Sequence, residues 1–212
     1  MARNEEIAKI LLELKAVTLS PKEPYTYASG IKSPIYCDNR LVISAVEERE
    51  KVVQAMLEAV EELEYDVIAG TATAGIPWAA YLADRLKKPM IYVRDKAKEH
   101  GKGNQIEGKL EAGQRVLVIE DLISTGGSSV RAVEAVKEAG GIVEYTVAIF
   151  TYEMEKAKKS FEDASCKVIT LTNFSTLIRV AKENELVTEE EGNAVLEWNK
   201  DPAGWAAKQG LE

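Results

Sequence analysis

The sequence predicts an α/β fold in which a mainly parallel central sheet carries helices on both faces. Short apolar runs such as residues 116–119 are rich in β-branched residues, which is typical of strands buried on both faces. Segments with helical spacing of apolar residues separate these runs, and this alternation favours parallel strand pairing. The 212 residues suit one domain, or one domain with a small appendage.

The first 44 residues precede the alternating region, and we expect them to form an N-terminal hood over the core, residues 45–212. A first helix is predicted from four apolar residues that share one face: Ile7, Ile10, Leu11 and Leu14. Residues 18–44 contain three prolines and several hydroxyl side chains, which favours short strands and turns over helix.

The core is predicted as an alternation of strands and helices. The expected strands are residues 66–70, 90–93, 116–119, 142–150 and 167–171. Helices are expected after a capping box at residues 44–47, from Pro77 to Leu86, and from Val130 to the Gly140-Gly141 pair.

Two short helices are expected near the C-terminus. Ser175 can cap the first, and Thr188 with Glu191 matches a capping box for the second. The residues after Asp201-Pro202 have no such pattern, and we expect a loose tail.

Composition limits the class of protein. The chain is 46% hydrophobic and 29% charged, as globular proteins commonly are. We expect no membrane span, because no apolar run approaches ~20 residues, and no signal peptide. Cys37 and Cys166 are the only cysteines, and they favour free thiols in a reducing cytoplasm. The net charge of −8 argues against a nucleic-acid-binding surface.

Residues 116–129 are the most informative segment. The apolar strand leads into two adjacent carboxylates, Glu120 and Asp121, then into a turn of small residues at 124–129 and a helical pattern from Val130. The N–H groups of a glycine turn and of a helix N-terminus attract an anionic phosphate. Carboxylates would repel that phosphate, so we interpret them as groups that hold ribose hydroxyls, or magnesium through its waters. An ordinary strand-to-helix turn is the alternative.

A second turn of small residues, 70–77, follows the expected strand 66–70. Its two glycines have the spacing of a nucleotide P-loop, but that loop requires Lys and Ser or Thr after the second glycine. Ile76 and Pro77 stand there, so the P-loop interpretation fails. Backbone amides of such a turn can still approach a diphosphate. A plain strand–helix connection is the alternative.

Residues 94–108 combine basic side chains with glycines and show no periodicity. From Arg94 to Lys102, four basic residues and two acids give a local charge of +2 within a chain of −8. Long irregular stretches in compact domains are usually functional or mobile. Arg94, Lys98 and His100, the only histidine, are therefore candidates for contact with an anionic ligand. A solvated run of surface charges is the alternative.

The strand, acidic pair and hydroxyl-rich glycine turn of residues 116–128 resemble the phosphoribosyl-diphosphate (PRPP) signature of the type I phosphoribosyltransferases. Two other segments narrow the resemblance to the orotate phosphoribosyltransferases. One is the Arg-x3-Lys-x-His-Gly loop from Arg94 with its late Ile-Glu-Gly, and the other is the Ser-Gly-x-x-Ser-Pro run from Ser29. Residues 70–77 also resemble the diphosphate-binding loop of this family. The resemblance covers about residues 25–150 and implies a type I phosphoribosyltransferase-like fold.

This resemblance implies transfer of a 5-phosphoribosyl group from PRPP to orotate, which gives orotidine 5′-monophosphate and diphosphate in pyrimidine biosynthesis. It implies Lys98 and Asp121 as catalytic residues, and Ser124 as an orotate contact. The implied PRPP-binding residues are Arg94, Lys98, His100, Glu120, Asp121, Leu122, Ile123, Ser124, Thr125, Gly126, Gly127 and Ser128.

The resemblance also implies Mg²⁺ as a cofactor that is held mainly by PRPP, without direct protein ligands. It implies a cytoplasmic homodimer in which the 94–108 loop reaches the partner subunit's site, with no nucleic-acid or membrane partner. The chain departs from relatives in four places. Alanine stands at 28 and 74 where some have lysine, Asp95 replaces the second member of a basic doublet, and residues 151–154 contain no arginine. Lys32 is a possible replacement for the first lysine, and Tyr36 is a candidate for stacking on the base.

Three other functions fit parts of this pattern. The nearest is a phosphoribosyltransferase for a purine or for uracil. A PRPP-binding regulator without catalysis would need a basic surface or a helix-turn-helix, which the acidic balance disfavours. An α/β protein without catalysis is the last.

Overall fold

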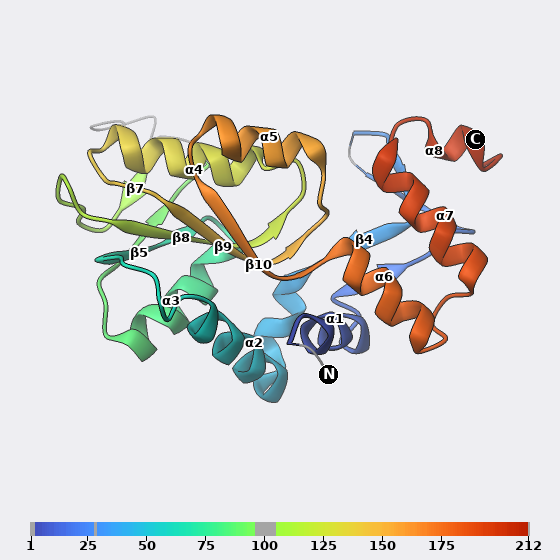
Figure 1. The fold of residues 1–212 in the computed structure, drawn as a ribbon, viewed down its shortest axis with the longest axis horizontal. Helices are drawn as coiled ribbons and strands as arrows, with labels where there is room; N and C mark the ends of the chain where they lie inside the picture. Colours follow the sequence, from blue (N-terminus) through green and yellow to red (C-terminus); the bar gives the residue numbers. More distant parts are fainter. Residues whose placement is uncertain (1–2, 28, 96–104, 212) are drawn as a thin grey trace.

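The computed structural model describes residues 3–27, 29–95 and 105–211, and its centre is a six-stranded sheet (Figure 1). The strand order is β10-β9-β8-β5-β6-β7, and all pairs are parallel except β6 with β7. The strands are β5 (Val67–Thr71), β6 (Met90–Val93), β7 (Ile106–Glu107), β8 (Val116–Ile123), β9 (Tyr145–Thr151) and β10 (Lys167–Asn173). The predicted α/β fold with a mainly parallel sheet is therefore confirmed.

Helices cover both faces of the sheet, as Figure 1 shows. One face carries α1 (Arg3–Glu13), α2 (Val46–Ala59) and α3 (Gly75–Leu86), and the other carries α4 (Gly127–Glu138) and α5 (Glu155–Asp163). Successive side chains of a strand point to opposite faces. Leu117 and Ile119 accordingly belong to one hydrophobic cluster with Trp78 of α3, whereas Val116 and Val118 belong to a second one with α4.

The N-terminal strands and the C-terminal helices lie side by side next to the sheet (Figure 1). The N-terminal strands are β1 (Val17–Leu19), β2 (Tyr25–Thr26), β3 (Lys32–Ser33) and β4 (Ile35–Cys37), followed by the 3₁₀ helix η1 (Asn39–Ser44). Figure 1 shows α6 (Phe174–Glu183), α7 (Glu189–Lys200) and α8 (Trp205–Lys208) next to them. The hood thus contains residues from both termini, and the division of the chain after residue 44 stays a prediction.

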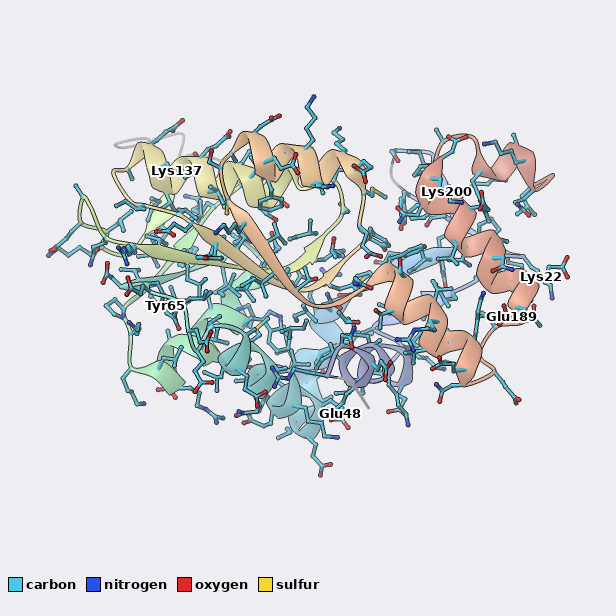
Figure 2. The ribbon with its side chains drawn as sticks, in the orientation of Figure 1. Lys22, Glu48, Tyr65, Lys137, Glu189 and Lys200 are labelled. Carbon is cyan, nitrogen blue, oxygen red and sulfur yellow. The ribbon has the colours of Figure 1, made fainter. Side chains whose placement is uncertain are left out.

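Side-chain contacts join α7 to the N-terminal strands. The Trp198 indole donates a 3.1 Å hydrogen bond to the Lys32 carbonyl oxygen and packs edge-on against Tyr27. Figure 2 shows Lys22 and Glu189 on the outer side of this layer, where Lys22 forms an ion pair of 2.7 Å with Glu191. The indole contact is buried and the ion pair exposed, so the indole contributes most to holding the layer.

The expected loose tail is wrong. Residues after Asp201 form α8, and Trp205 is only 1% exposed, with its indole N–H donating to the Ala194 carbonyl oxygen at 2.7 Å. The sequence pattern is too short to show helical periodicity, but an indole needs both apolar contact and a hydrogen-bond acceptor, and α7 supplies both.

Of the three helix caps predicted above, one is confirmed. Thr188 and Glu191 form the predicted capping box of α7. The box predicted at residues 44–47 is absent, because Ser44 Oγ donates to the Leu41 carbonyl oxygen inside η1 and leaves Ala45 as the N-cap of α2. Asn173, not Ser175, caps α6, since its side chain accepts from the Thr176 N–H. A preceding 3₁₀ helix and a preceding strand decide these positions, and neither is visible in local spacing.

Trp205→Ala should lower the free energy of unfolding by about 3–5 kcal/mol, because it removes a buried aromatic side chain. Urea unfolding followed by circular dichroism measures this. Leu186→Ala is the control, since Leu186 is 58% exposed and its loss should change stability by at most about 0.5 kcal/mol. Equal midpoints for Trp205→Ala and the wild type would contradict the described packing of α8.

Candidate functional site

The carboxyl ends of β5, β6 and β8 meet at one edge of the sheet. Thr71 pairs in register with Val93, and Gly70 pairs with Ile119 on the other side. This register brings the turn after β5, Arg94 after β6, and the Glu120-Asp121 pair in β8 to the same edge, as parallel strands require. Three of the segments that the sequence singles out therefore converge on one site.

The strand that carries the carboxylates is longer than predicted. We expected residues 116–119, whereas β8 continues to Ile123 and includes Glu120 and Asp121. The sequence pattern missed the second half of β8 because a buried strand is recognised by continuous apolar residues, and Glu120 and Asp121 interrupt that run. Ile123 is 2% exposed and its carbonyl oxygen accepts from the Tyr152 N–H. Its side chain therefore belongs to the core, and any ligand contact would come from its backbone.

Glu120 is held inside the protein. It is 4% exposed, and its Oε2 accepts a 2.9 Å hydrogen bond from the Ser129 hydroxyl of α4. Oε1 accepts from the Asp121 N–H at 3.0 Å. Burial raises the pKa of Glu120, and the nearby Asp121 carboxyl raises it further. Ser129 belongs to the predicted turn but was not predicted as a site residue, because its link to Glu120 depends on the fold.

Asp121 lies on the side of the N-terminal segment. Burial raises the pKa of its carboxyl, while the guanidinium of Arg40 acts in the opposite direction. The Asn39 amide donates a 2.8 Å hydrogen bond to the Asp121 carbonyl oxygen. Asn39 and Arg40 are additional site residues that sequence reasoning missed, although they directly follow the Ser-Pro segment that it singled out.

The turn after β8 has the geometry predicted for an anion site. Gly126 adopts a left-handed φ of +80°, and a Cβ there would lie 3.2 Å from the Ala157 Cα of α5. Helix α4 begins at Gly127, and the first N–H groups of a helix lack acceptors within it. These groups, together with the helix dipole, favour a bound anion. Ser124 is half-buried, while Thr125 and Ser128 are exposed on this turn.

The turn after β5 approaches β8 very closely. A Cβ on Gly75 would lie 2.5 Å from the Ile119 carbonyl oxygen, so no larger residue fits at the start of α3 without a shift. Thr71 ends β5 with its side chain 4% exposed, and its buried hydroxyl has no hydrogen-bond partner among the described residues. A ligand oxygen could satisfy that hydroxyl, which is consistent with the predicted diphosphate-binding turn.

The base of the 94–108 loop is fixed to the sheet. The Arg94 N–H donates to the Gln105 carbonyl oxygen at 2.9 Å, and residues 106–107 form β7 on the edge of β6. Asp95 forms a 2.7 Å ion pair with Arg131 of α4. The stretch expected to be irregular thus contains a short strand. Lys98 and His100 lie outside the described residues, and their roles stay predictions.

Of the two residues suggested for base binding, Tyr36 is exposed and Lys32 is bonded to the C-terminal segment. Tyr36 is 43% exposed, packs against Tyr25 with ring centres 5.6 Å apart, and stands three residues before Asn39, whose side chain bonds to β8. Lys32 instead donates from Nζ to the Leu211 carbonyl oxygen near the C-terminus. That bond directs its charge toward the chain end.

The site offers few groups for direct metal coordination. No cluster of three or more Asp, Glu, His or Cys side chains occurs within residues 3–27, 29–95 and 105–211. Two neighbouring carboxylates can bind Mg²⁺ through water or beside substrate phosphates, which is the usual arrangement for this ion. The described residues therefore fit a magnesium ion that arrives with an anionic substrate.

None of the described helices has the length and apolar character of a membrane span.

Comparisons with known proteins agree with this geometry. Residues 43–182 match the family model for the phosphoribosyl transferase domain. The chain is 55% identical to the orotate phosphoribosyltransferase of Listeria innocua over 207 residues. This alignment covers 97% of this chain and 99% of that protein. It superposes with a TM-score of 0.75 on the crystal structure of orotate phosphoribosyltransferase from Aeropyrum pernix (27% identity, 86% of this chain, 99% of that chain). The TM-score is 0.78 for Leishmania donovani UMP synthase (25% identity, 93% of this chain, 42% of that chain).

Glu120→Gln should reduce the dependence of stability on pH in the ligand-free protein. Burial raises the pKa of Glu120 from 4.5 to about 8, so the folded state retains a proton that the unfolded state releases. The contribution of Glu120 to stability is therefore complete below about pH 4.5 and is lost as the pH rises toward 8. The slope that glutamine removes is at most about 1.4 kcal/mol per pH unit.

Urea unfolding at intervals from about pH 5 to about pH 9 tests this expectation. Asp121, whose pKa is also raised, should leave part of the slope in the variant. Glu134→Gln, on the exposed side of α4, is the control and should behave as the wild type. Parallel profiles for wild type and Glu120→Gln would show that Glu120 is ionised in the folded protein.

Proposed function

The chain belongs to the orotate phosphoribosyltransferases of the phosphoribosyltransferase-domain family, and from this premise we propose how its residues transfer the 5-phosphoribosyl group from PRPP to N1 of orotate. The products are orotidine 5′-monophosphate and diphosphate, a step of pyrimidine biosynthesis. One observation carries the assignment: buried Glu120 and half-buried Asp121 lead directly into left-handed Gly126 and the N-terminus of α4.

The turn at residues 124–128 binds the 5′-phosphate of PRPP. The N–H groups at the start of α4 point their positive ends at that position, and a dianionic phosphate offers the acceptors that they lack. The hydroxyl groups of Ser124, Thr125 and Ser128 can donate further hydrogen bonds. The resemblance to the orotate phosphoribosyltransferases implies that Ser124 also contacts the base. Gly126 keeps this turn close to α5, since any side chain there would meet Ala157.

Glu120 and Asp121 hold the ribose hydroxyls. As diphosphate departs, the sugar becomes oxocarbenium-like, and the positive charge grows within reach of the Asp121 carboxylate. A preorganised negative group in a partly buried site stabilises such a charge more than water does. Asp121 is therefore the catalytic carboxylate, while Glu120, tied to Ser129, positions the strand end and the sugar.

The leaving diphosphate is bound by the turn after β5 and by the cations of the 94–108 loop. The amides near Gly75 and the unpaired Thr71 hydroxyl face the same strand edge as Arg94. Lys98 and His100 neutralise the negative charge that develops on the diphosphate. Glu120 and Asp121 would face a magnesium ion that arrives with PRPP, and the ion would supply additional positive charge for the departing diphosphate.

We propose a homodimer in which the 94–108 loop reaches the partner subunit's site. Leu41 and Val46 support an interface near the site: their exposed fractions are 47% and 60%, and both follow the Asn39 segment. The net charge of −8 gives no support for a nucleic-acid partner. The two cysteines are free thiols, which supports a cytoplasmic location.

A base screen tests the substrate assignment. With PRPP and Mg²⁺, the protein should release diphosphate with orotate and give orotidine 5′-monophosphate by chromatography. Uracil, adenine, guanine and hypoxanthine serve as alternative acceptors under the same conditions. If one of these bases were turned over faster than orotate, that base would be assigned as the substrate. Binding of PRPP without any turnover would favour a regulator.

Lys98→Ala should lower kcat by about 10²–10³-fold, equivalent to about 2.7–4 kcal/mol, because one electrostatic contact to the transition state is lost. Lys109→Ala, at an exposed lysine paired with Glu111, is the control and should retain wild-type turnover. Circular dichroism and the urea midpoint show whether each variant is folded. An unchanged kcat for Lys98→Ala would remove Lys98 from the mechanism.

Mixing the inactive Lys98→Ala and Asp121→Asn proteins then tests the shared site. In a homodimer with exchanged loops, a mixed dimer has one site with both native residues, so roughly one site in four should regain activity. No recovery after subunit exchange, shown by mass spectrometry of labelled chains, would place Lys98 in its own subunit's site.

A further inference from the structure

Arg40 lies at the substrate edge because its neighbour is fixed to the central strand. The Asn39 side chain, which is fully buried, donates to the Asp121 carbonyl oxygen at 2.8 Å. The Asp38 N–H in turn donates to the Ala16 carbonyl oxygen at 2.7 Å. Two hydrogen bonds thus hold the two residues that precede Arg40, and the position of Arg40 relative to Asp121 is set by the fold.

The guanidinium of Arg40 is oriented by Asp38. Its Nε and Nη2 donate to the two carboxylate oxygens of Asp38 at 2.6 and 2.8 Å. This bidentate contact occupies the Nε–Nη2 edge of the planar guanidinium. The N–H groups of Nη1 lie outside the contact with Asp38. The side chain is 64% exposed, so those groups are accessible to a ligand. An arginine oriented in this way can bind a second carboxylate without losing the first.

The groups around Arg40 match an acidic aromatic ligand. Asp121 and the Tyr36 phenol are both close enough to the Arg40 guanidinium to act on it electrostatically, so Arg40 lies near the proposed ribose site and near the exposed aromatic ring. A planar base attached at C1 of the ribose and stacked on Tyr36 would carry its substituents toward Arg40.

Other cations near the base are directed elsewhere. Lys32 donates to the Leu211 carbonyl oxygen. Residues 151–154 contain no cation, and Glu153 there accepts hydrogen bonds from the Ser175 N–H and hydroxyl of α6. Lys156 lines a cavity of about 810 Å³ with Ile31 and with Thr125 of the turn at residues 124–128, so it is a competitor for the base among the residues that the structure describes.

We propose that Arg40, oriented by Asp38, binds the carboxylate of orotate and makes the site selective for an acidic pyrimidine over a neutral one. This inference rests on the proposed transfer of phosphoribose to orotate. It assigns a specificity-determining contact to a residue of η1 and makes Asp38 a positioning residue that acts through Arg40.

Initial rates of Arg40→Gln test the proposal, with orotate varied at saturating PRPP and PRPP varied at saturating orotate. The KM for orotate should rise about tenfold or more, the typical effect of losing a hydrogen bond to a charged group. The KM for PRPP should stay within about twofold, since uniform loss of base binding leaves the other substrate unaffected. Asp38→Asn should raise the KM for orotate by a smaller factor, because it releases the fork but keeps its charge.

Three measurements separate this role from alternatives. Competitive inhibition by uracil, which lacks the carboxylate, should be equal in wild type and Arg40→Gln, whereas a structural defect would weaken it. Arg179→Gln changes another exposed arginine, which lies on α6 and pairs with Glu5 of α1 and with Glu183. This variant should leave both KM values unchanged. Lys156→Gln should also leave the KM for orotate unchanged.

An unchanged KM for orotate in Arg40→Gln would overturn the proposal, as would an equal rise for PRPP or a selective rise in Lys156→Gln. Failure of the proposed function is distinguishable, because the wild type itself would then show no turnover with orotate.

Discussion

The close approach of Gly75 to β8 constrains the whole site. The Ile119 carbonyl oxygen leaves no room for a side chain at the start of α3, so the turn after β5 lies against the central strand. This contact fixes one wall of the site directly beside Glu120. The opposite wall is fixed in the same way, since Gly126 holds the turn after β8 against α5. Two glycines therefore allow the close packing of the two turns at which two anionic groups of one substrate would be bound.

The carboxylate pair lies between these two turns, and its two side chains contact different parts of the protein. Side chains of a strand alternate between faces, so Glu120 leaves β8 on the α4 side and Asp121 on the side of the N-terminal segment. Glu120 is tied down by Ser129, and Asp121 is adjacent to Asn39 and Arg40. An adjacent acidic pair thus connects the proposed phosphate-binding turn with the hood. In the proposed site, backbone amides and a few local cations bind the anionic substrates of a chain whose net charge is −8.

Much of this arrangement could be predicted from the sequence because it depends on local chemistry. The strand at residues 116–119, the glycine turn after it and the alternation of elements follow from side-chain type and spacing. The length of β8, the burial of Trp205 and the cap at Asn173 depend on contacts between distant segments. Arg40 belongs to the second group, since nothing in its own neighbourhood indicates that Asn39 bonds to β8 some eighty residues later.

The hydrogen bonds that tie Lys32 to Leu211 and Trp198 to Lys32 have a practical consequence. Peptide added after residue 211 would emerge next to β3, within the layer that covers the base side of the site. Arg3, in contrast, begins α1 on the outer surface, with its guanidinium paired to Glu58. Purification tags and fluorescent labels are therefore better fused ahead of the first helix, where they leave substrate entry undisturbed.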